Sequence, residues 1–207
     1  MSKTIAAITK SLTLSIIAIA VLMIGQGVAR AETVSFSTAG SFNGGGNSIT
    51  FGSGGNLLTI AFTGVSSTVD ANPFTFASLG MLQTTVTGSG ATITPGTVFT
   101  LIVNQVAPGA GSSSFVSTVG GRIDQNTSTG LVTFSVSTAT IQGVTYALTN
   151  NPTLLVPPAT NNGMTTIQAG ITVAPIPEPA TLLLFGTGLT GLAGYARRRM
   201  KRGRSTE

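Results

Sequence analysis

Short stretches in the middle of the chain alternate between apolar and polar residues. In NLLTIAFTG, residues 56–64, Leu58, Ile60 and Phe62 share one face, and threonine and alanine occupy the other. A period of two is typical of a strand with one buried and one exposed face. The same period, or nearly so, runs through TVSFST, TVFTLIVN, LVTFSVSTATI, GVTYALTN and TIQAGITV.

Turn-forming segments separate these stretches, so the pattern predicts an all-β domain. In LVTFSVSTATI, residues 131–141, Val132, Phe134 and Val136 share a face. The separating segments are rich in Gly, Pro, Asn and Ser: AGSFNGGGN, GSGGN, TGSGATITPG, APGAGSSS, DQNTSTG and NNPTLLVPPATNNG. We expect an antiparallel β-sandwich of about 8–10 strands over residues 32–174, without helices. A β-solenoid is the alternative, weakened by the absence of a fixed internal repeat.

The polar content of this region admits a second interpretation. Ser and Thr supply 43 of the 143 residues from 32 to 174, a composition that also fits a disordered stalk. The period of two favours a folded domain, because alternation separates a buried face from an exposed one. The length suits one domain with a buried core.

The N-terminal region has the pattern of a secretory signal peptide. Two lysines precede an apolar run from Leu12 to Ile24, and Ala29 and Ala31 follow it. This order predicts a signal peptide over residues 1–31, cut by signal peptidase before Glu32. The alternative is an uncleaved anchor, although the 13-residue run is shorter than the roughly 17–25 residues that span a bilayer.

A second apolar segment lies near the C-terminus. The seventeen residues from Ala180 to Ala196 carry no charge, and as a helix they would measure about 25 Å, a marginal span. We expect a transmembrane helix over 180–196 with a basic stop-transfer tail over 197–204. Because Lys and Arg mark the cytoplasmic flank, the preceding domain would lie outside. The basic residues of the tail are Arg197, Arg198, Arg199, Lys201, Arg202 and Arg204.

Three glycines in this segment match the spacing of a dinucleotide-binding turn. Gly186, Gly188 and Gly191 form G-x-G-x-x-G, which binds NAD or FAD only within a βαβ unit of about 30 residues. The sixteen residues after Gly191 hold no crossover helix, no second strand and no acid but Glu207. We therefore predict no cofactor and interpret the glycines as small residues of a membrane helix.

The motif Pro177-Glu178-Pro179, the Gly-rich apolar segment and the Arg-rich end follow one another in order. Together they resemble the PEP-CTERM sorting signal, over about residues 175–204. The resemblance implies export, a transient stay in the inner membrane, and processing by an exosortase that recognises Pro177, Glu178 and Pro179. The product then passes to the cell surface or the exopolysaccharide. The alternative is an ordinary anchor that is never cut.

The middle of the chain also bears some similarity to the choice-of-anchor β-sandwich surface domains. This similarity rests on the strand pattern and has no motif of its own. This similarity implies a β-sandwich, the same fold class that the alternation of apolar and polar residues predicts.

The net charge of +5 and the pI near 10.5 do not indicate a nucleic-acid partner. Between Glu32 and Glu178 the only charged residues are Asp70, Arg122 and Asp124. Nucleic-acid binding requires Lys and Arg on the folded surface, and the predicted domain has one such residue.

Little in the predicted domain supports catalysis. The chain has no His and no Cys, which excludes Ser-His-Asp and Cys-His sites and zinc sites built from these ligands. A glycoside hydrolase, the remaining enzymatic alternative, needs two carboxyl groups about 5–10 Å apart. Glu32, Asp70 and Asp124 are the only candidates, and the two aspartates lie in loop-like contexts where Asp forms turns.

The segment DQNTSTG has the start of a calcium-loop pattern. Asp124, Asn126 and Ser128 alternate, but such a loop has Gly at its sixth position and Glu at its twelfth. Here Gly130 is seventh and Ser135 twelfth, so we predict a polar turn and no metal site. Residues 126–128 also form an N-x-S sequon.

Glycan binding is the alternative to a purely structural role. Sugar-binding surfaces use exposed aromatic rings, whereas the chain has no Trp. We expect the following aromatic residues in the core: Phe36, Phe62, Phe99, Phe134 and Tyr146. The sequence thus predicts a non-enzymatic surface or exopolysaccharide-matrix protein. A glycan-binding or adhesive module remains the alternative, through a flat Ser/Thr/Asn face.

We predict that signal peptidase cuts between Ala31 and Glu32, because small side chains at Ala29 and Ala31 suit its site. N-terminal sequencing of the exported protein should therefore begin at Glu32. A sequence that still begins at Met1 would favour the uncleaved anchor.

Overall fold

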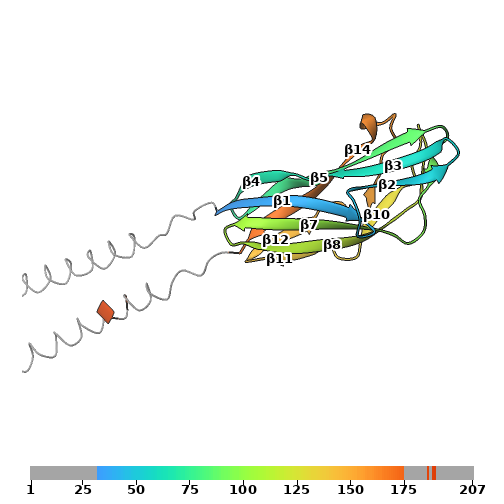
Figure 1. Ribbon diagram of the computed structural model, residues 1–207. Helices are drawn as coiled ribbons and strands as arrows, with labels where there is room; N and C mark the ends of the chain where they lie inside the picture. The colour runs from blue at the N-terminus through green and yellow to red at the C-terminus, as the bar shows by residue number, and fades with distance from the viewer. Residues whose placement is uncertain (1–31, 175–185, 187, 190–207) are drawn as a thin grey trace, which may run out of the picture. The chain divides into compact units, whose positions relative to one another are not determined.

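The computed structural model describes residues 32–174 together with Gly186, Gly188 and Leu189. The chain divides into two compact units, one of residues 31–174 and one of residues 1–30 with 175–207. The first unit contains two six-stranded sheets, shown in Figure 1. Every strand pair in it is antiparallel, which confirms the predicted all-β class.

Each of the two sheets is named here by one of its strands, β1 or β5. The β1 sheet has the order β13 (Thr153–Leu154), β10 (Leu131–Phe134), β8 (Gly111–Gly120), β7 (Thr97–Ala107), β1 (Glu32–Phe42) and β4 (Ser66–Ala71). The β5 sheet has the order β11 (Thr138–Ile141), β12 (Val144–Leu148), β14 (Met164–Val173), β5 (Phe74–Thr87), β3 (Asn56–Thr63) and β2 (Ser48–Ser53). A small ribbon pairs β6 (Ala91–Thr92) with β9 (Arg122–Ile123), and a 3₁₀ turn, η1, spans Asn161–Gly163.

The two sheets pack face to face, as expected for a sandwich. The Phe36 ring on β1 meets Tyr146 on β12 of the other sheet at a centroid distance of 5.8 Å, and Phe62 on β3 meets Phe99 on β7 at 5.2 Å. The five aromatic residues predicted for the core are all buried. The described domain has fourteen strands, more than predicted, because β6, β9 and β13 are too short to show a period and because one predicted strand is divided in two.

One predicted strand is divided between the two sheets. LVTFSVSTATI forms β10 in the β1 sheet and β11 in the β5 sheet, and Val136 between them is 51% exposed. The Asn151 side chain ends the first strand, because its Oδ1 accepts from Phe134 N–H and its Nδ2 donates to Phe134 O, both at 2.9 Å. The prediction that Val136 shares the buried face of Phe134 was therefore wrong.

Three further local predictions were wrong. The segment AGSFNGGGN begins inside β1, the segment APGAGSSS ends inside β8, and Asp70 lies in strand β4. Glycine misled the first two predictions, because on β1 and β8 it serves close packing. A Cβ at Gly111 would lie 2.7 Å from Ile141 Cγ2 on β11.

The core is closely packed around Phe62. A Cβ at Gly40 on β1 would lie 2.5 Å from Phe62 Cδ1 and 2.7 Å from Phe99 Cε2. On the other side, a Cβ at Gly80 on β5 would collide with the end of the same Phe62 ring, and Gly80 has a φ of +127°. Glycine at both positions lets the two backbones approach the ring.

A polar group is also enclosed between the sheets. The Tyr146 hydroxyl donates to Gln105 Oε1 at 2.9 Å, and Gln105 Nε2 donates to the carbonyl of Gly109 at 2.8 Å and to that of Ile141 at 3.3 Å. Burial raises the pKa of Tyr146 to about 12. Within the described residues, no buried side-chain nitrogen or oxygen lacks a hydrogen-bond partner.

We predict that Gly40→Ala destabilises the domain by about 1–3 kcal/mol, because the new methyl group pushes two aromatic rings apart in a closely packed core. Denaturant unfolding of the full chain, followed by circular dichroism, measures this loss. Gly120→Ala is the matched control: Gly120 also lies in a strand, and its Cβ would have nothing within 4 Å. Equal midpoints for the two variants would contradict the packing role of Gly40.

Candidate functional site

The predicted sorting and processing residues lie outside the described residues. They are Ala29 and Ala31 of the signal-peptidase site, Pro177, Glu178 and Pro179 of the sorting motif, and the basic tail over 197–204. The structure describes the two points from which these segments leave the β domain. These points are Glu32, the first residue of β1, and Val173, the last residue of β14.

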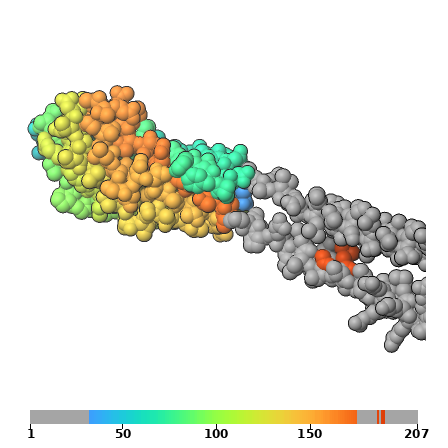
Figure 2. Space-filling model, turned by 180° about the vertical axis from the view of Figure 1, so that it is seen from behind, coloured from blue at the N-terminus to red at the C-terminus, as the bar shows by residue number. Residues whose placement is uncertain are grey.

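Both points lie at the same end of the sandwich, here called the attachment end. Glu32 pairs with Ala71 at the end of β4. The chain then turns through Asn72 and Pro73 into β5, and Val173 N–H donates to Pro73 O at 3.0 Å. Figure 2 shows this teal segment beside the blue start of β1 and the dark orange end of β14.

The strand that leads to the sorting motif is held in the middle of its sheet. β14 pairs with β12 on one side, from Val144↔Val173 to Leu148↔Ala169, and with β5 on the other, from Met164↔Gln83 to Thr172↔Phe74. A tail that follows Val173 therefore continues from a strand with hydrogen-bonded neighbours on both sides.

The structure does not bring the two aspartates together. Asp70 lies on β4 near the attachment end, where its Oδ1 accepts from Thr33 Oγ1 at 3.1 Å. Asp124 follows β9, just beyond the opposite end of β8. Since β1 has 11 residues at about 3.3 Å each, roughly 30 Å separates the two ends. This distance does not suit the carboxylate pair of a glycoside hydrolase.

The Asp124 segment is a polar turn, as predicted. Its Oδ1 accepts from the backbone N–H groups of Asn126 at 3.0 Å and Thr127 at 2.7 Å, and its Oδ2 accepts from Thr127 Oγ1 at 2.8 Å. These hydrogen bonds, those from Thr127 first, lower the pKa of Asp124. Over the described part of the chain, no group of three or more acidic, His or Cys residues could hold a metal ion.

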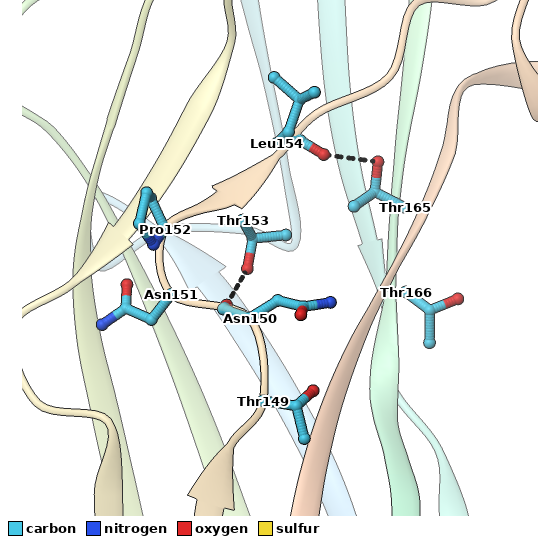
Figure 3. A pocket seen from close by; sticks show the side chains of 8 residues that line it. All are labelled: Thr149, Asn150, Asn151, Pro152, Thr153, Leu154, Thr165 and Thr166. Carbon is cyan, nitrogen blue, oxygen red and sulfur yellow. Dashed lines mark hydrogen bonds between the residues drawn. The ribbon is translucent and has the colours of Figure 1, made fainter.

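An open polar hollow of about 470 Å³ lies between β14 and the segment that carries β13. Figure 3 shows the Asn150 side chain pointing toward the strand of Thr165 and Thr166, whereas Asn151 points the other way. Several lining groups are already paired: Thr153 Oγ1 donates to Asn150 O at 2.6 Å, and Thr165 Oγ1 donates to Leu154 O at 3.4 Å. The hollow offers amide and hydroxyl groups but no charge.

A pair of aromatic rings that the sequence did not predict is exposed at the attachment end. Phe74 and Phe76 on β5 are 48% and 64% exposed, and their ring centroids are 4.7 Å apart. Both lie on the outer face of the β5 sheet. The core prediction named five other aromatic residues and did not cover these two.

A bulge in β5 explains their exposure. Gly80 pairs with Ile167 but Ser78 pairs with Gln168, so Leu79 is an extra residue on β5. One inserted residue moves all preceding side chains to the opposite face. Without it, Phe74 and Phe76 would share the inner face with Leu82. The only signal in the sequence is Gly80 itself, since glycine in a strand often marks a bulge.

Comparison with known families identifies the segment that follows the β domain. The family described as "PEP-CTERM protein-sorting motif" matches residues 175–200. The chain carries a PEP-CTERM sorting motif. Neither a curated protein nor a solved structure matches the chain.

The PEP-CTERM motif implies processing by an exosortase, export through a membrane-anchored precursor, and delivery to the surface. It begins directly after the described domain, two residues beyond Val173. No helix within the described residues has both the length and the apolar character needed to cross a membrane. Of the helix predicted over 180–196, the structure describes only Gly186, Gly188 and Leu189, which are helical.

Proposed function

We propose that the chain is an exported, non-enzymatic protein of the cell surface or exopolysaccharide matrix, delivered through its PEP-CTERM motif. The observation that carries this proposal is the match of the motif to residues 175–200. The common attachment end supports it, because a domain whose two connections leave from one end can be anchored through that end alone.

Two processing steps belong to the proposal. Signal peptidase removes residues 1–31 after export, and the helix over 180–196 with its basic tail holds the precursor in the inner membrane. Exosortase then recognises Pro177, Glu178 and Pro179. Proline supports this recognition physically, because it favours an extended backbone that a protease can bind.

The non-enzymatic role is supported by the chemistry of the β domain. The chain has no His and no Cys, and the described aspartates occupy opposite ends of the sandwich. Hydroxyl groups instead bond to one another across neighbouring strands, as in Ser35 with Thr68 at 2.9 Å and Thr50 with Thr59 at 2.9 Å. Such pairs stabilise sheets, and neither hydroxyl group in a pair is a base that activates the other as a nucleophile.

Glycan binding is a second candidate, favoured by the polar hollow beside β14. Asn150 and Thr166 are exposed there, and their amide and hydroxyl groups can exchange hydrogen bonds with sugar hydroxyls. The site contains no aromatic residue, so binding through it would be weak. A pull-down with purified exopolysaccharide, comparing the unmodified chain with Asn150→Ala, separates this role from a purely structural one.

We predict that replacing Pro177, Glu178 and Pro179 together by alanine traps the protein in the inner membrane at precursor length. The apolar segment and the basic tail survive, so insertion is unchanged. Recognition is lost because alanine lets the helix continue through the motif and because the carboxylate is removed. The measurement is a blot of membrane and surface fractions, with one tag in the β domain and one after Glu207.

A matched control replaces Ser205 and Thr206 by alanine, since both lie beyond the matched residues 175–200. This control should lose its C-terminal tag and reach the surface as the unmodified protein does. If the Pro-Glu-Pro variant also lost its C-terminal tag and reached the surface, the motif would not direct sorting.

A further inference from the structure

The exposed rings of Phe74 and Phe76 form a compact apolar projection on the outer face of the β5 sheet. Their planes lie at 84° to each other, in an edge-to-face contact with centroids 4.7 Å apart. Among the described residues, the other large exposed hydrophobic side chains, such as Val116 and Leu154, are aliphatic. The pair is therefore the one exposed aromatic cluster of the described domain.

The backbone beneath the pair fixes its position. Phe74 covers Gly170 on β14, where a Cβ would lie 2.7 Å from Phe74 Cε2 and 3.0 Å from Phe74 Cζ. Gly170 is buried although it faces outward, because the ring shields it. Such packing of an aromatic ring over a strand glycine stabilises the sheet. The second ring, Phe76, packs against the first and is 64% exposed.

The pair also lies close to the point where the tail leaves the domain. Phe74 is the first residue of β5 and pairs with Thr172, one residue before the end of β14. Phe76 lies about 7 Å further along the strand. Eight positions separate Thr172 from Ala180, where the predicted membrane helix begins. Even fully extended, this connection spans at most about 28 Å.

The geometry favours a lipid surface over a sugar. A sugar ring rests on a flat aromatic face, but two rings at 84° share no plane. The polar groups suited to sugar hydroxyls lie elsewhere, in the hollow of Asn150 and Thr166. Aromatic side chains do enter the boundary between lipid headgroups and acyl chains, and the short connection keeps this pair near that boundary.

We propose that Phe74 and Phe76 contact the membrane that holds the precursor and orient the β domain against it until the tail is cut. This proposal rests on the proposed function, because it requires an anchored precursor. The rings contact the membrane only while the tail is intact. The anchored tail keeps them at a high local concentration beside the membrane, which two partly buried rings need in order to bind it. The described charges near this end are the acids Glu32 and Asp70, which do not attract anionic lipids. Apolar contact between the two rings and the lipid therefore provides the attraction.

The test uses the absence of tryptophan from the chain. The variant Phe76→Trp carries a single tryptophan at the proposed contact, and the control Leu154→Trp carries one on β13. Leu154 is 52% exposed and pairs with Leu131, which pairs with Gly120 at the end of β8 away from the attachment end. Each full-length precursor is incorporated into phosphatidylcholine vesicles with or without brominated acyl chains, which quench tryptophan on contact.

We expect brominated lipid to reduce the emission of the Phe76→Trp protein by about two-fold or more and to leave the Leu154→Trp protein unchanged, because only the former reaches the acyl-chain boundary. Equal emission of the Phe76→Trp protein in both kinds of vesicle would overturn the proposal. So would a response to added soluble exopolysaccharide without quenching by lipid, which would assign the pair to glycans.

A separate readout tests the anchor itself. Retention of a C-terminal tag in the vesicles after an alkaline wash shows that the precursor is anchored. An anchored Phe76→Trp precursor without quenching rejects the aromatic contact alone. Loss of the tag from the vesicles rejects the anchored precursor, and with it both the membrane step of the proposed function and the contact that depends on it.

Discussion

The close approach of the two sheets around Phe62 determines much of the remaining structure. The ring lies between Gly40 of the β1 sheet and Gly80 of its own sheet, and it contacts Phe99, which also meets Phe42 and Phe134. A packed interior tolerates little change in volume. The position of this ring therefore fixes the separation of the sheets, and the inward-facing rows of both sheets must meet around it.

The alternation of residues predicted those strands in which every second side chain faces the core from end to end. β3 and β12 are such strands, with Leu58, Ile60 and Phe62 buried on the first and Val144 and Tyr146 on the second. The prediction failed where an interaction between distant segments interrupts the period. Asn151 divides residues 131–141 between two sheets, and the bulge in β5 exists only in relation to β14. A local pattern contains no information on either partner.

The candidate functional residues fall into the same two groups: those that a local pattern predicts and those that depend on contacts between distant segments. The sorting motif could be recognised from sequence because a contiguous segment carries it: prolines, an apolar run and a basic end in fixed order. The attachment end could not be recognised from sequence, because it depends on which strand ends meet when β4 turns into β5 beside β14. The Phe74 and Phe76 pair depends in addition on the bulge at Leu79, which turns two residues of an apparently inward row toward solvent.

The place of β14 in its sheet connects the fold to the sorting signal. A pull on the tail loads this strand first, and five residue pairs with β12 and nine with β5 hold it in the sheet. The ladder hydrogen bonds lie perpendicular to the strands, so a force along the strand axis loads both ladders in parallel. An edge strand such as β2 has one ladder only. A tail that continued from β2 would transmit the same force to half as many neighbouring strands, and the sheet would open from its edge.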